Sequence, residues 1–151
     1  MKAGQPGGSV LQHAYRPADE SVSLVDSTVG GLLAQRAHTH ADRLALVGVR
    51  HDDGAEARLS FAELYDEAGR VATALCALVE RGSYIAIWAP NVVEWPIIQY
   101  GAALAGMVLV ALNPALREEE LEYALTHSGA AALIYAETSR DHDEYGDGNV
   151  R

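Results

Sequence analysis

The stretch that decides the fold is residues 83–114, SYIAIWAPNVVEWPIIQYGAALAGMVLVALNP. An uncharged, mostly apolar run at residues 84–89 precedes Pro90, and a second apolar run at residues 107–112 follows Gly106. Parallel strands that are covered on both faces are apolar along their whole length, so both runs are predicted to be buried strands. The residues between them predict a helix that ends at Gly106. Strand, helix and strand in this order form one parallel crossover unit.

Pro96 restricts where the helix of this unit begins. Asn91 and Glu94 are residue types that cap helices, but a helix capped there would place Pro96 at its fifth position, where a proline costs about 3 kcal/mol. Proline is tolerated in the first turn, because its missing N–H has no partner there. We therefore expect the regular helix to begin near Trp95 or Pro96.

The residues before this unit predict a helix and a hairpin. Thr28 is a suitable N-cap for a helix that fades near His40. Residues 44–49 and 57–60 are predicted to be strands, and the polar turn between them, around Asp53, predicts a β-hairpin.

Ser60 opens the best-marked helix of the chain. Ser60 and Glu63 form a capping box, and Leu59 and Leu64 occupy the two positions of a hydrophobic staple. The apolar stripe of this helix, which we expect to pack on a sheet, contains Phe61, Leu64, Tyr65, Ala68, Val71, Ala72, Leu75 and Leu78. Gly82 ends the segment.

The alternation of helix and strand continues after Pro114. The segment Arg117-Glu-Glu-Glu120 places three carboxylates in the first turn of a helix, where the positive end of the helix dipole favours them. Gly129 is suited to the end of that helix, and residues 130–136 predict a further strand. Repeated crossovers predict an α/β fold, with a mostly parallel sheet and helices on its faces.

Composition limits the domain count and the partners. The 151 residues are 49% hydrophobic, which is enough for one ordinary domain. We expect a flexible N-terminal arm at residues 1–26, a folded part at residues 27–137 and a polar tail at residues 138–151. The net charge of −10 argues against a nucleic-acid partner, which requires clustered Lys and Arg. The only cysteine, Cys76, excludes an internal disulfide, so we expect a cytoplasmic protein.

No membrane or secretion signal is visible in the sequence. The longest mostly apolar run, at residues 96–112, is shorter than the ~20 residues that a membrane helix needs, so we expect no transmembrane segment. Residues 1–17 have no apolar core of signal-peptide length.

Two segments resemble motifs of the adenylate-forming, or AMP-binding, enzymes. Leu59-Ser-Phe-Ala-Glu-Leu64 resembles the first core motif, and Leu104-Ala-Gly-Met-Val-Leu-Val-Ala-Leu-Asn-Pro114 resembles the second. Residues 85–95 look like the segment that joins them, and residues 119–129 are similar to the acyl-CoA synthetase branch. The resemblance covers roughly residues 25–136. It implies a partial N-terminal subdomain of the acyl-CoA synthetase fold.

The resemblance also implies a reaction that this chain is not equipped to perform alone. Full-length members use ATP and Mg²⁺ to join a carboxylic acid to AMP, and then pass the acyl group to coenzyme A. Their Ser/Thr- and Gly-rich phosphate loop and their C-terminal catalytic Lys have no counterpart in this sequence. We therefore expect no catalytic, cofactor-binding or metal-binding residues, and an N-terminal fragment of a fatty-acid or other carboxylic-acid ligase that is truncated and inactive alone.

A second hypothesis is a non-catalytic scaffold or assembly module. A partial parallel sheet leaves an unpaired edge, which recruits a partner strand or promotes self-association. The chain would then pair with another chain, or with itself, through an exposed sheet edge.

Other short patterns have structural explanations. Gly101-x-x-x-x-Gly106 has the glycine spacing of a phosphate loop, but the required Lys and Ser/Thr do not follow, so close helix packing or a helix stop explains both glycines. His38 and His40 point to different faces of a helix, so we interpret them as solvent-exposed rather than as metal ligands.

Three further features are interpreted in the same way. Cys76 lies near the apolar stripe of its helix, which favours a packed thiol over a nucleophile. Trp88 and Trp95 are expected to pack in the core rather than to line an acyl pocket. Residues 141–146 begin like a calcium loop but have Tyr at the fifth position, so we interpret them as part of a solvated acidic tail.

Overall fold

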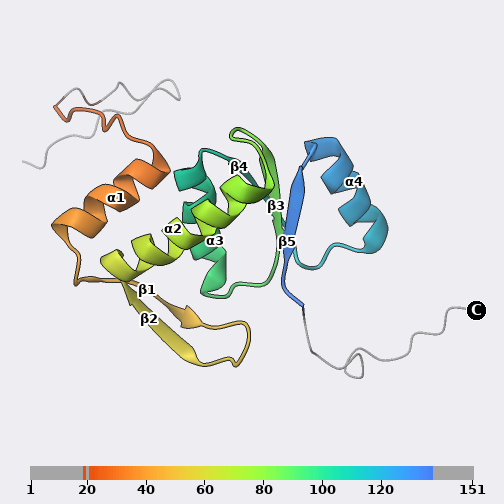
Figure 1. Cartoon of the computed structure of the whole chain (residues 1–151), viewed down its shortest axis with the longest axis horizontal. Helices are drawn as coiled ribbons and strands as arrows, with labels where there is room; N and C mark the ends of the chain where they lie inside the picture. The colour runs from red at the N-terminus through yellow and green to blue at the C-terminus, as the bar shows by residue number, and fades with distance from the viewer. Residues whose placement is uncertain (1–18, 20, 138–151) are drawn as a thin grey trace, which may run out of the picture.

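The computed structural model describes residue 19 and residues 21–137 (Figure 1). In chain order its elements are α1 (Val29–Thr39), β1 (Leu44–Val49), β2 (Glu56–Ser60), α2 (Phe61–Leu78), β3 (Tyr84–Trp88), α3 (Glu94–Ala105), β4 (Val108–Leu112), α4 (Glu118–Ser128) and β5 (Ala132–Tyr135). This order confirms the predicted succession of a helix, a hairpin and repeated crossovers.

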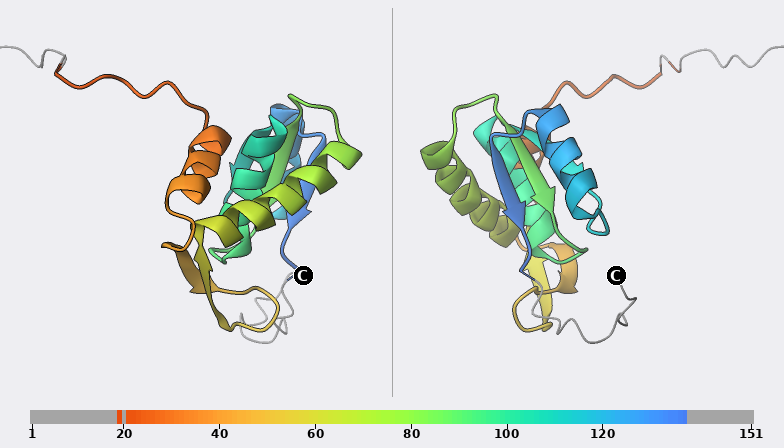
Figure 2. Two further views of the ribbon diagram at one scale, coloured as in Figure 1. Left: turned by 60° about the vertical axis from the view of Figure 1, so that its left-hand side comes forward. Right: turned by 90° about the vertical axis from the view of Figure 1, so that its right-hand side faces the viewer.

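The parallel sheet has the order β4-β3-β5. Ile85 of β3 lies between Leu109 of β4 and Ala132 of β5, and both pairings are parallel. The side chains of Ile85, Ala86 and Ile87 are fully buried, as predicted for a strand covered on both faces. Figure 2 shows α2 and α3 on one face of this sheet and α4 on the other. The predicted α/β class is therefore confirmed.

The hairpin of β1 and β2 is a separate antiparallel sheet. Its inner face contributes the buried Ala57 and Leu59 to a core cluster that also contains Leu33 of α1 and Leu64 of α2. Val93, which precedes α3 and is buried, belongs to the same cluster, together with Ala68 of α2 and Ile97 of α3. The hairpin thus holds the amino-terminal part of α2 against the start of α3.

The predicted helix ends are observed. Thr28 caps α1 by accepting a hydrogen bond from the N–H of Gly31 at 3.0 Å. The capping box of Ser60 and Glu63 is formed in both directions. Gly106 closes α3 with a φ of 71°, in the left-handed region that glycine adopts without steric cost.

The start of α3 agrees with the constraint that Pro96 imposes. The helix begins at Glu94, one residue before the earlier of the two predicted starts, so Pro96 lies in its first turn. Val93 occupies the N-cap position and makes no side-chain capping bond. Asn91 is therefore not the cap, and the carboxylate of Glu94 takes part in a different contact, described below.

The prediction that the apolar stripe of α2 packs on a sheet is correct in part, since Leu64 packs in one cluster with Ala57 and Leu59 of the hairpin. The main partner of α2 is α3, and two residues of the stripe are exposed: Tyr65 at 36% and Leu78 at 73%. The close approach of the two helices depends on Gly101, because a Cβ there would lie 2.5 Å from Cγ1 of Val71. The carboxyl-terminal half of α2 lies over the parallel sheet, where Leu75 packs in one cluster with Ile85, and its amino-terminal half packs on the hairpin.

The second strand of the crossover unit is less buried than predicted. Residues 107–112 are expected to be fully covered, but β4 is an edge strand and Val108 is 45% exposed. Met107, just before the strand, is buried.

Candidate functional site

The carboxyl ends of the parallel strands are the first place to look for a site. In open α/β sheets, ligands bind outside these ends, at the point where successive connections leave in opposite directions. Here the connection from β3 leads to one side, and the connection from β4 passes back across β3 to β5 on the other side. The end of β3 therefore lies at such a switch point.

A small hollow is present at this point. It encloses about 120 Å³ and is lined by Trp88, Ala89, Pro90, Pro114 and Ala136. The indole Nε1–H of Trp88 donates to the backbone oxygen of Asn113 at 3.0 Å, so its one polar atom is already used. The hollow carries no charged side chain and is well below the roughly 300–1,000 Å³ of ordinary ligand pockets.

The loop after β4 is fixed by a turn rather than by a ligand. The side-chain oxygen of Asn113 accepts a hydrogen bond from the N–H of Ala115 at 2.9 Å. Such Asx turns stabilise a change of chain direction. Asn113 and Pro114 therefore define the turn from β4 toward α4. They are the last two residues of the segment 104–114, which resembles the second core motif of the AMP-binding enzymes.

His51 connects the hairpin to this end of the sheet. Its backbone N–H donates to the carboxylate of Glu94 at 3.2 Å, and its ring Nε2 lies 2.8 Å from the backbone oxygen of Glu137. A carbonyl oxygen only accepts, so Nε2 is the donor in the second contact. The imidazole is thus committed to a structural hydrogen bond rather than directed toward open space.

Sequence reasoning missed His51. The residue lies in a polar turn, and its two partners are 43 and 86 residues away along the chain. Nothing in the local pattern around His51 signals these contacts, because they depend on how the hairpin packs beside α3.

A second hollow lies between β1 and the start of α3. It encloses about 230 Å³ and is lined by Leu46, Val47, Gly48, Asn91, Val92, Val93, Trp95 and Pro96. The N–H of Val93 donates to the oxygen of Val49 at 2.9 Å, which holds the segment before α3 against the edge of β1. This hollow also lacks charged side chains.

Both tryptophans are half-buried. Trp88 lines the first hollow and Trp95 lines the second, and neither belongs to the two core clusters or to the side chains packed against them, so the expected core packing is not observed. The structure therefore brings the two residues to two separate hollows and not to one acyl pocket.

The two glycines that resemble a phosphate loop have the structural roles that were predicted. Gly101 is buried at the crossing of α3 with α2, and Gly106 ends α3. Neither belongs to a loop that could surround a phosphate group, because both lie at or within the carboxyl-terminal half of a helix.

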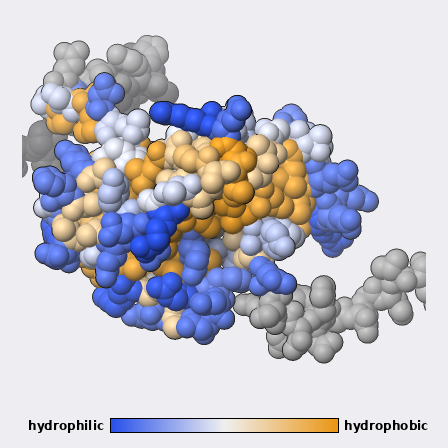
Figure 3. Space-filling view, viewed as in Figure 1, coloured by the Kyte–Doolittle hydropathy of each residue, from blue (hydrophilic) through white to orange (hydrophobic). Residues whose placement is uncertain are grey.

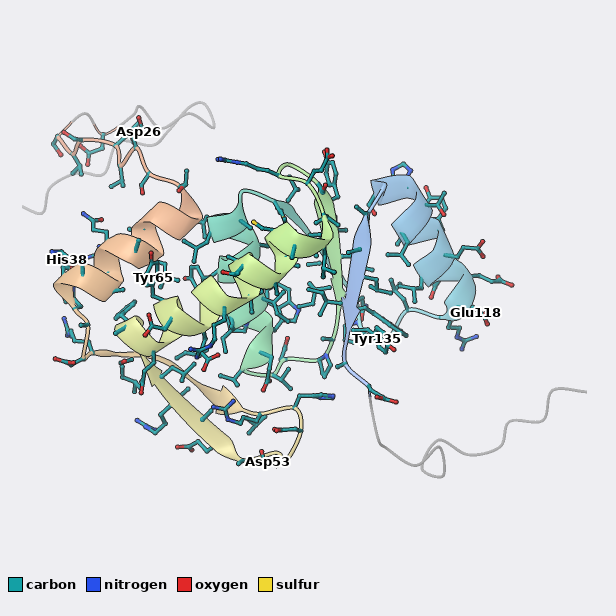
Figure 4. All side chains as sticks on the ribbon, in the orientation of Figure 1. Asp26, His38, Asp53, Tyr65, Glu118 and Tyr135 are labelled. Carbon is teal, nitrogen blue, oxygen red and sulfur yellow. The ribbon has the colours of Figure 1, made fainter. Side chains whose placement is uncertain are left out.

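His38 of α1 and His40, the C-cap of that helix, are not part of a metal site among the described residues. His38 is exposed on the surface of α1 (Figure 4), and His40 is half-buried with its Nδ1 2.8 Å from the hydroxyl of Thr39. Within residue 19 and residues 21–137, no group of three His, Cys, Asp or Glu side chains could hold a metal ion. Residues 141–146 lie outside the described residues.

The expectation that Cys76 is a packed thiol is wrong. Cys76 is exposed, although its neighbour Leu75 is 3% exposed. One residue step turns a helical side chain by about 100°, so the position directly after a buried residue leaves the buried face.

The two lowered carboxylate pKa values belong to local turns. The backbone hydrogen bond from Ser60, followed by that of its side chain, lowers the pKa of Glu63, and hydrogen bonds from Ser21 lower the pKa of Asp19. Both carboxylates hold local turns of the chain at the surface.

Across the described part of the chain, no helix is long and apolar enough to cross a membrane.

Comparisons with known proteins agree with the family that the sequence motifs resemble. Residues 33–149 match the family described as AMP-binding enzyme. The mitochondrial medium-chain acyl-CoA ligase ACSF2 of Mus musculus is 35% identical over 123 residues, which cover 81% of this chain and 19% of that protein. The corresponding ligase of Danio rerio is 37% identical over 130 residues. The chain thus spans about a fifth of the length of the curated relatives it matches.

A solved structure also matches the fold. The N-terminal domain of FACL13 from Mycobacterium tuberculosis superposes with a TM-score of 0.64 at 32% identity, covering 73% of this chain and 27% of that domain. The O-succinylbenzoate coenzyme A synthetase of Bacillus subtilis, solved with ATP and magnesium, gives a TM-score of 0.64 at 29% identity.

Proposed function

Because this chain belongs to the family of AMP-binding enzymes and corresponds to the N-terminal region of its acyl-CoA synthetases, we propose that it contributes the first part of an ATP-dependent acid–CoA ligase. The complete ligase would activate a carboxylic acid as its acyl-AMP and then form the thioester with coenzyme A. The similarity to medium-chain acyl-CoA ligases favours a fatty acid as the substrate and a role in fatty-acid metabolism. A cytoplasmic location is part of the same proposal.

Among the described residues, those at the carboxyl end of β3 do not fit ATP or Mg²⁺. Phosphate sites use backbone N–H groups of a glycine-rich loop together with Lys or Arg, and Mg²⁺ needs carboxylate oxygens beside the phosphates. The hollow at the carboxyl end of β3 is lined by Trp88, two prolines and two alanines, and it holds no charged group. The single lysine of the sequence, Lys2, lies outside the described residues. No step of the reaction is therefore assigned to residues of this chain.

We also propose that this chain alone does not activate an acid. The uncharged hollow is the observation that supports this part of the proposal. Transition states of phosphoryl and adenylyl transfer are stabilised by placed charges and hydrogen-bond donors. An apolar hollow of about 120 Å³ supplies neither. Its role in the ligase would be to support a site built by other residues.

ATP–pyrophosphate exchange tests the proposal. The purified chain, ATP, Mg²⁺, labelled pyrophosphate and a panel of short-, medium- and long-chain acids should give no exchange above a no-enzyme background. A complete ligase of the family with its own acid is the positive control. Exchange that depends on both the acid and the chain would overturn the proposal of inactivity.

A second candidate function is a non-catalytic module that pairs with another chain. Exposed apolar side chains favour it: Leu78 is 73% exposed and Tyr135 is 61% exposed. Figure 3 shows apolar surface gathered over the middle of the molecule, where α2 lies beside the sheet. A stable, defined complex with a second chain would support this function, while concentration-dependent aggregation of the chain would contradict it.

A further inference from the structure

The turn of the β-hairpin, residues 50–55, contains an Asp–Gly pair that has no part in the candidate site. The pair, Asp53-Gly54, lies between β1 and β2, and both residues are exposed. Figure 4 shows Asp53 at the outer end of the hairpin. Nothing lies within 4 Å of a Cβ built at Gly54, so no neighbouring group covers the pair on that side. The pair is therefore open to water and to solutes.

An Asp–Gly pair can rearrange its own backbone. The backbone nitrogen of the glycine attacks the side-chain carbon Cγ of the protonated aspartic acid, and the new C–N bond closes a five-membered succinimide ring. The hydroxyl group of the acid leaves with the amide proton as water. A second water opens the ring. Opening at the side-chain carbonyl restores aspartate, and opening at the backbone carbonyl gives isoaspartate, whose main chain runs through the former side chain. Glycine favours the attack because it has no side chain to hinder it.

Two hydrogen bonds oppose this reaction in the closed turn. The N–H of Gly54 donates to the backbone oxygen of Arg50 at 3.2 Å, so the attacking nitrogen is engaged. The carboxylate oxygen Oδ1 of Asp53 accepts a hydrogen bond from the N–H of Ala55 at 2.8 Å, which fixes the side chain in an Asx turn. Ring closure removes the amide proton of the first bond and moves the carboxyl group of the second. Both bonds must therefore open before the ring can form.

The base of the turn is held in place from both sides. The N–H of Arg50 donates to the backbone oxygen of Ala55 at 2.9 Å, which closes the loop. The N–H of the next residue, His51, donates to the carboxylate of Glu94 at 3.2 Å and so ties the turn to α3. Gly54 has a φ of 67°, in the region that favours glycine. The bond from Gly54 to Arg50 therefore opens only when the turn departs from this arrangement.

We propose that Asp53-Gly54 is a latent site of isoaspartate formation, which is locked while the turn is closed and reacts when the hydrogen bond from Gly54 to Arg50 opens. Isoaspartate adds one methylene group to the main chain between Arg50 and Ala55, so the modified turn cannot close with the same bonds. The free backbone carboxylate of isoaspartate is the group that isoaspartyl methyltransferases esterify. These enzymes transfer the methyl group of S-adenosylmethionine and release S-adenosylhomocysteine. The proposal is independent of the proposed ligase function.

Comparison with a free peptide tests the proposal. The purified full chain and a peptide of residues 50–56, RHDDGAE, with blocked ends are incubated side by side in mildly acidic buffer, in which more of the carboxyl groups are protonated. Isoaspartate is detected by methylation with labelled S-adenosylmethionine. It is located by peptide mapping, which separates Asp53-Gly54 from the second Asp–Gly pair of the sequence, Asp147-Gly148. Formation at Asp53 should be at least about tenfold slower in the folded chain than in the peptide, and concentrated urea should abolish this difference.

Hydrogen exchange measures the lock directly. The amide of Gly54 should be protected in the folded chain by about the factor that slows ring closure, because both processes need the same opening. Two variants incubated in urea assign the reacting residue. Asp53→Glu should give no isoaspartate at this position, because its longer side chain does not form the five-membered ring. The matched control Asp52→Glu should leave formation at Asp53 unchanged.

Three results would overturn the proposal. They are equal rates of formation in the folded chain and the peptide, slow formation in a folded chain whose Gly54 amide exchanges freely, and no isoaspartate at Asp53 in urea. All three measurements use the unaltered chain, so they do not depend on the folding of a variant. The ligase function and the inactivity of the chain alone are tested separately by pyrophosphate exchange.

Discussion

The ring Nε2 of His51 lies 2.8 Å from the backbone oxygen of Glu137, 86 residues along the chain. His51 follows β1 and Glu137 follows β5, so this contact joins the hairpin to the carboxyl end of the parallel sheet. The N–H of the same residue donates to Glu94 in the first turn of α3. One residue therefore ties together three elements that the local sequence does not connect.

Replacement of His51 tests the value of this contact. His51→Ala removes the ring hydrogen bond but keeps the backbone bond to Glu94, so we expect a loss of about 1 kcal/mol in the free energy of unfolding. The midpoint of urea unfolding should fall while the slope stays constant. His38→Ala, on the exposed surface of α1, is the control and should have little effect. An equal loss in both variants would contradict a specific role of His51.

The close crossing of α2 and α3 at Gly101 predicts that a larger side chain there destabilises the fold. An alanine Cβ at this position would lie 2.5 Å from Cγ1 and 2.7 Å from Cβ of Val71, and 3.0 Å from the backbone oxygen of Ala68. Overpacking of this kind costs typically about 1–3 kcal/mol. Gly101→Ala should therefore lower the thermal midpoint, and the added substitution Val71→Ala should restore part of the loss.

Gly69→Ala is the matched control in α2. Nothing lies within 4 Å of a Cβ built at Gly69, so the substitution meets no neighbour. Alanine is favoured over glycine in a helix interior by roughly 0.5–1 kcal/mol, and this variant should be more stable than the unaltered chain. The same substitution is thus expected to act in opposite directions on two helices. A stabilising Gly101→Ala would mean that α3 does not approach α2 as closely as the structure shows.

The local part of the fold could be predicted from the sequence, because short-range chemistry specifies it. The capping box at Ser60, the three carboxylates at the start of α4 and the stop at Gly106 each act within one helical turn. The apolar run of β3 predicted a central strand for the same reason. These features set the order of elements and so the α/β class.

Contacts between distant elements could not be predicted in this way. An apolar stripe on α2 shows that the helix is buried on one side, but it does not show whether the cover is a sheet or α3. The bridge from His51 to Glu137 is set by hairpin packing. The candidate site shows the same division, since the hollow beside Trp88 combines residues from three separate strand ends.

The exposed position of Cys76 predicts fast chemical labelling. It is the only cysteine of the chain, so one thiol should react with a disulfide reagent in the folded protein without added denaturant. Cys76→Ser should change the free energy of unfolding by less than about 0.5 kcal/mol, as is usual for surface positions. Labelling that becomes complete only in urea would show that the thiol is covered.

The hydroxyl of Ser60 is expected to stabilise α2. It accepts a hydrogen bond from the N–H of Glu63 at 3.3 Å, and removal of an N-cap side chain costs about 1 kcal/mol. Ser60→Ala should lower the urea midpoint, while Ser60→Thr, which keeps the acceptor, should lower it less. Equal losses in the two variants would show that the hydroxyl is not the cap.

The carboxylate of Glu63 adds a pH dependence to the same cap. It accepts a hydrogen bond from the N–H of Ser60 at 2.8 Å, and this bond, followed by that of the Ser60 side chain, holds its pKa below the usual 4.5. The folded state therefore binds this proton more weakly than the unfolded state does. The resulting stability is fully present above pH 4.5 and is lost as the pH falls through the lowered pKa. The stability difference between the unaltered chain and Glu63→Gln, measured by urea unfolding at a series of pH values, should shrink below pH 4.5 in favour of the variant. A difference that stays constant or grows on acidification would contradict a carboxylate that is held ionised by the cap.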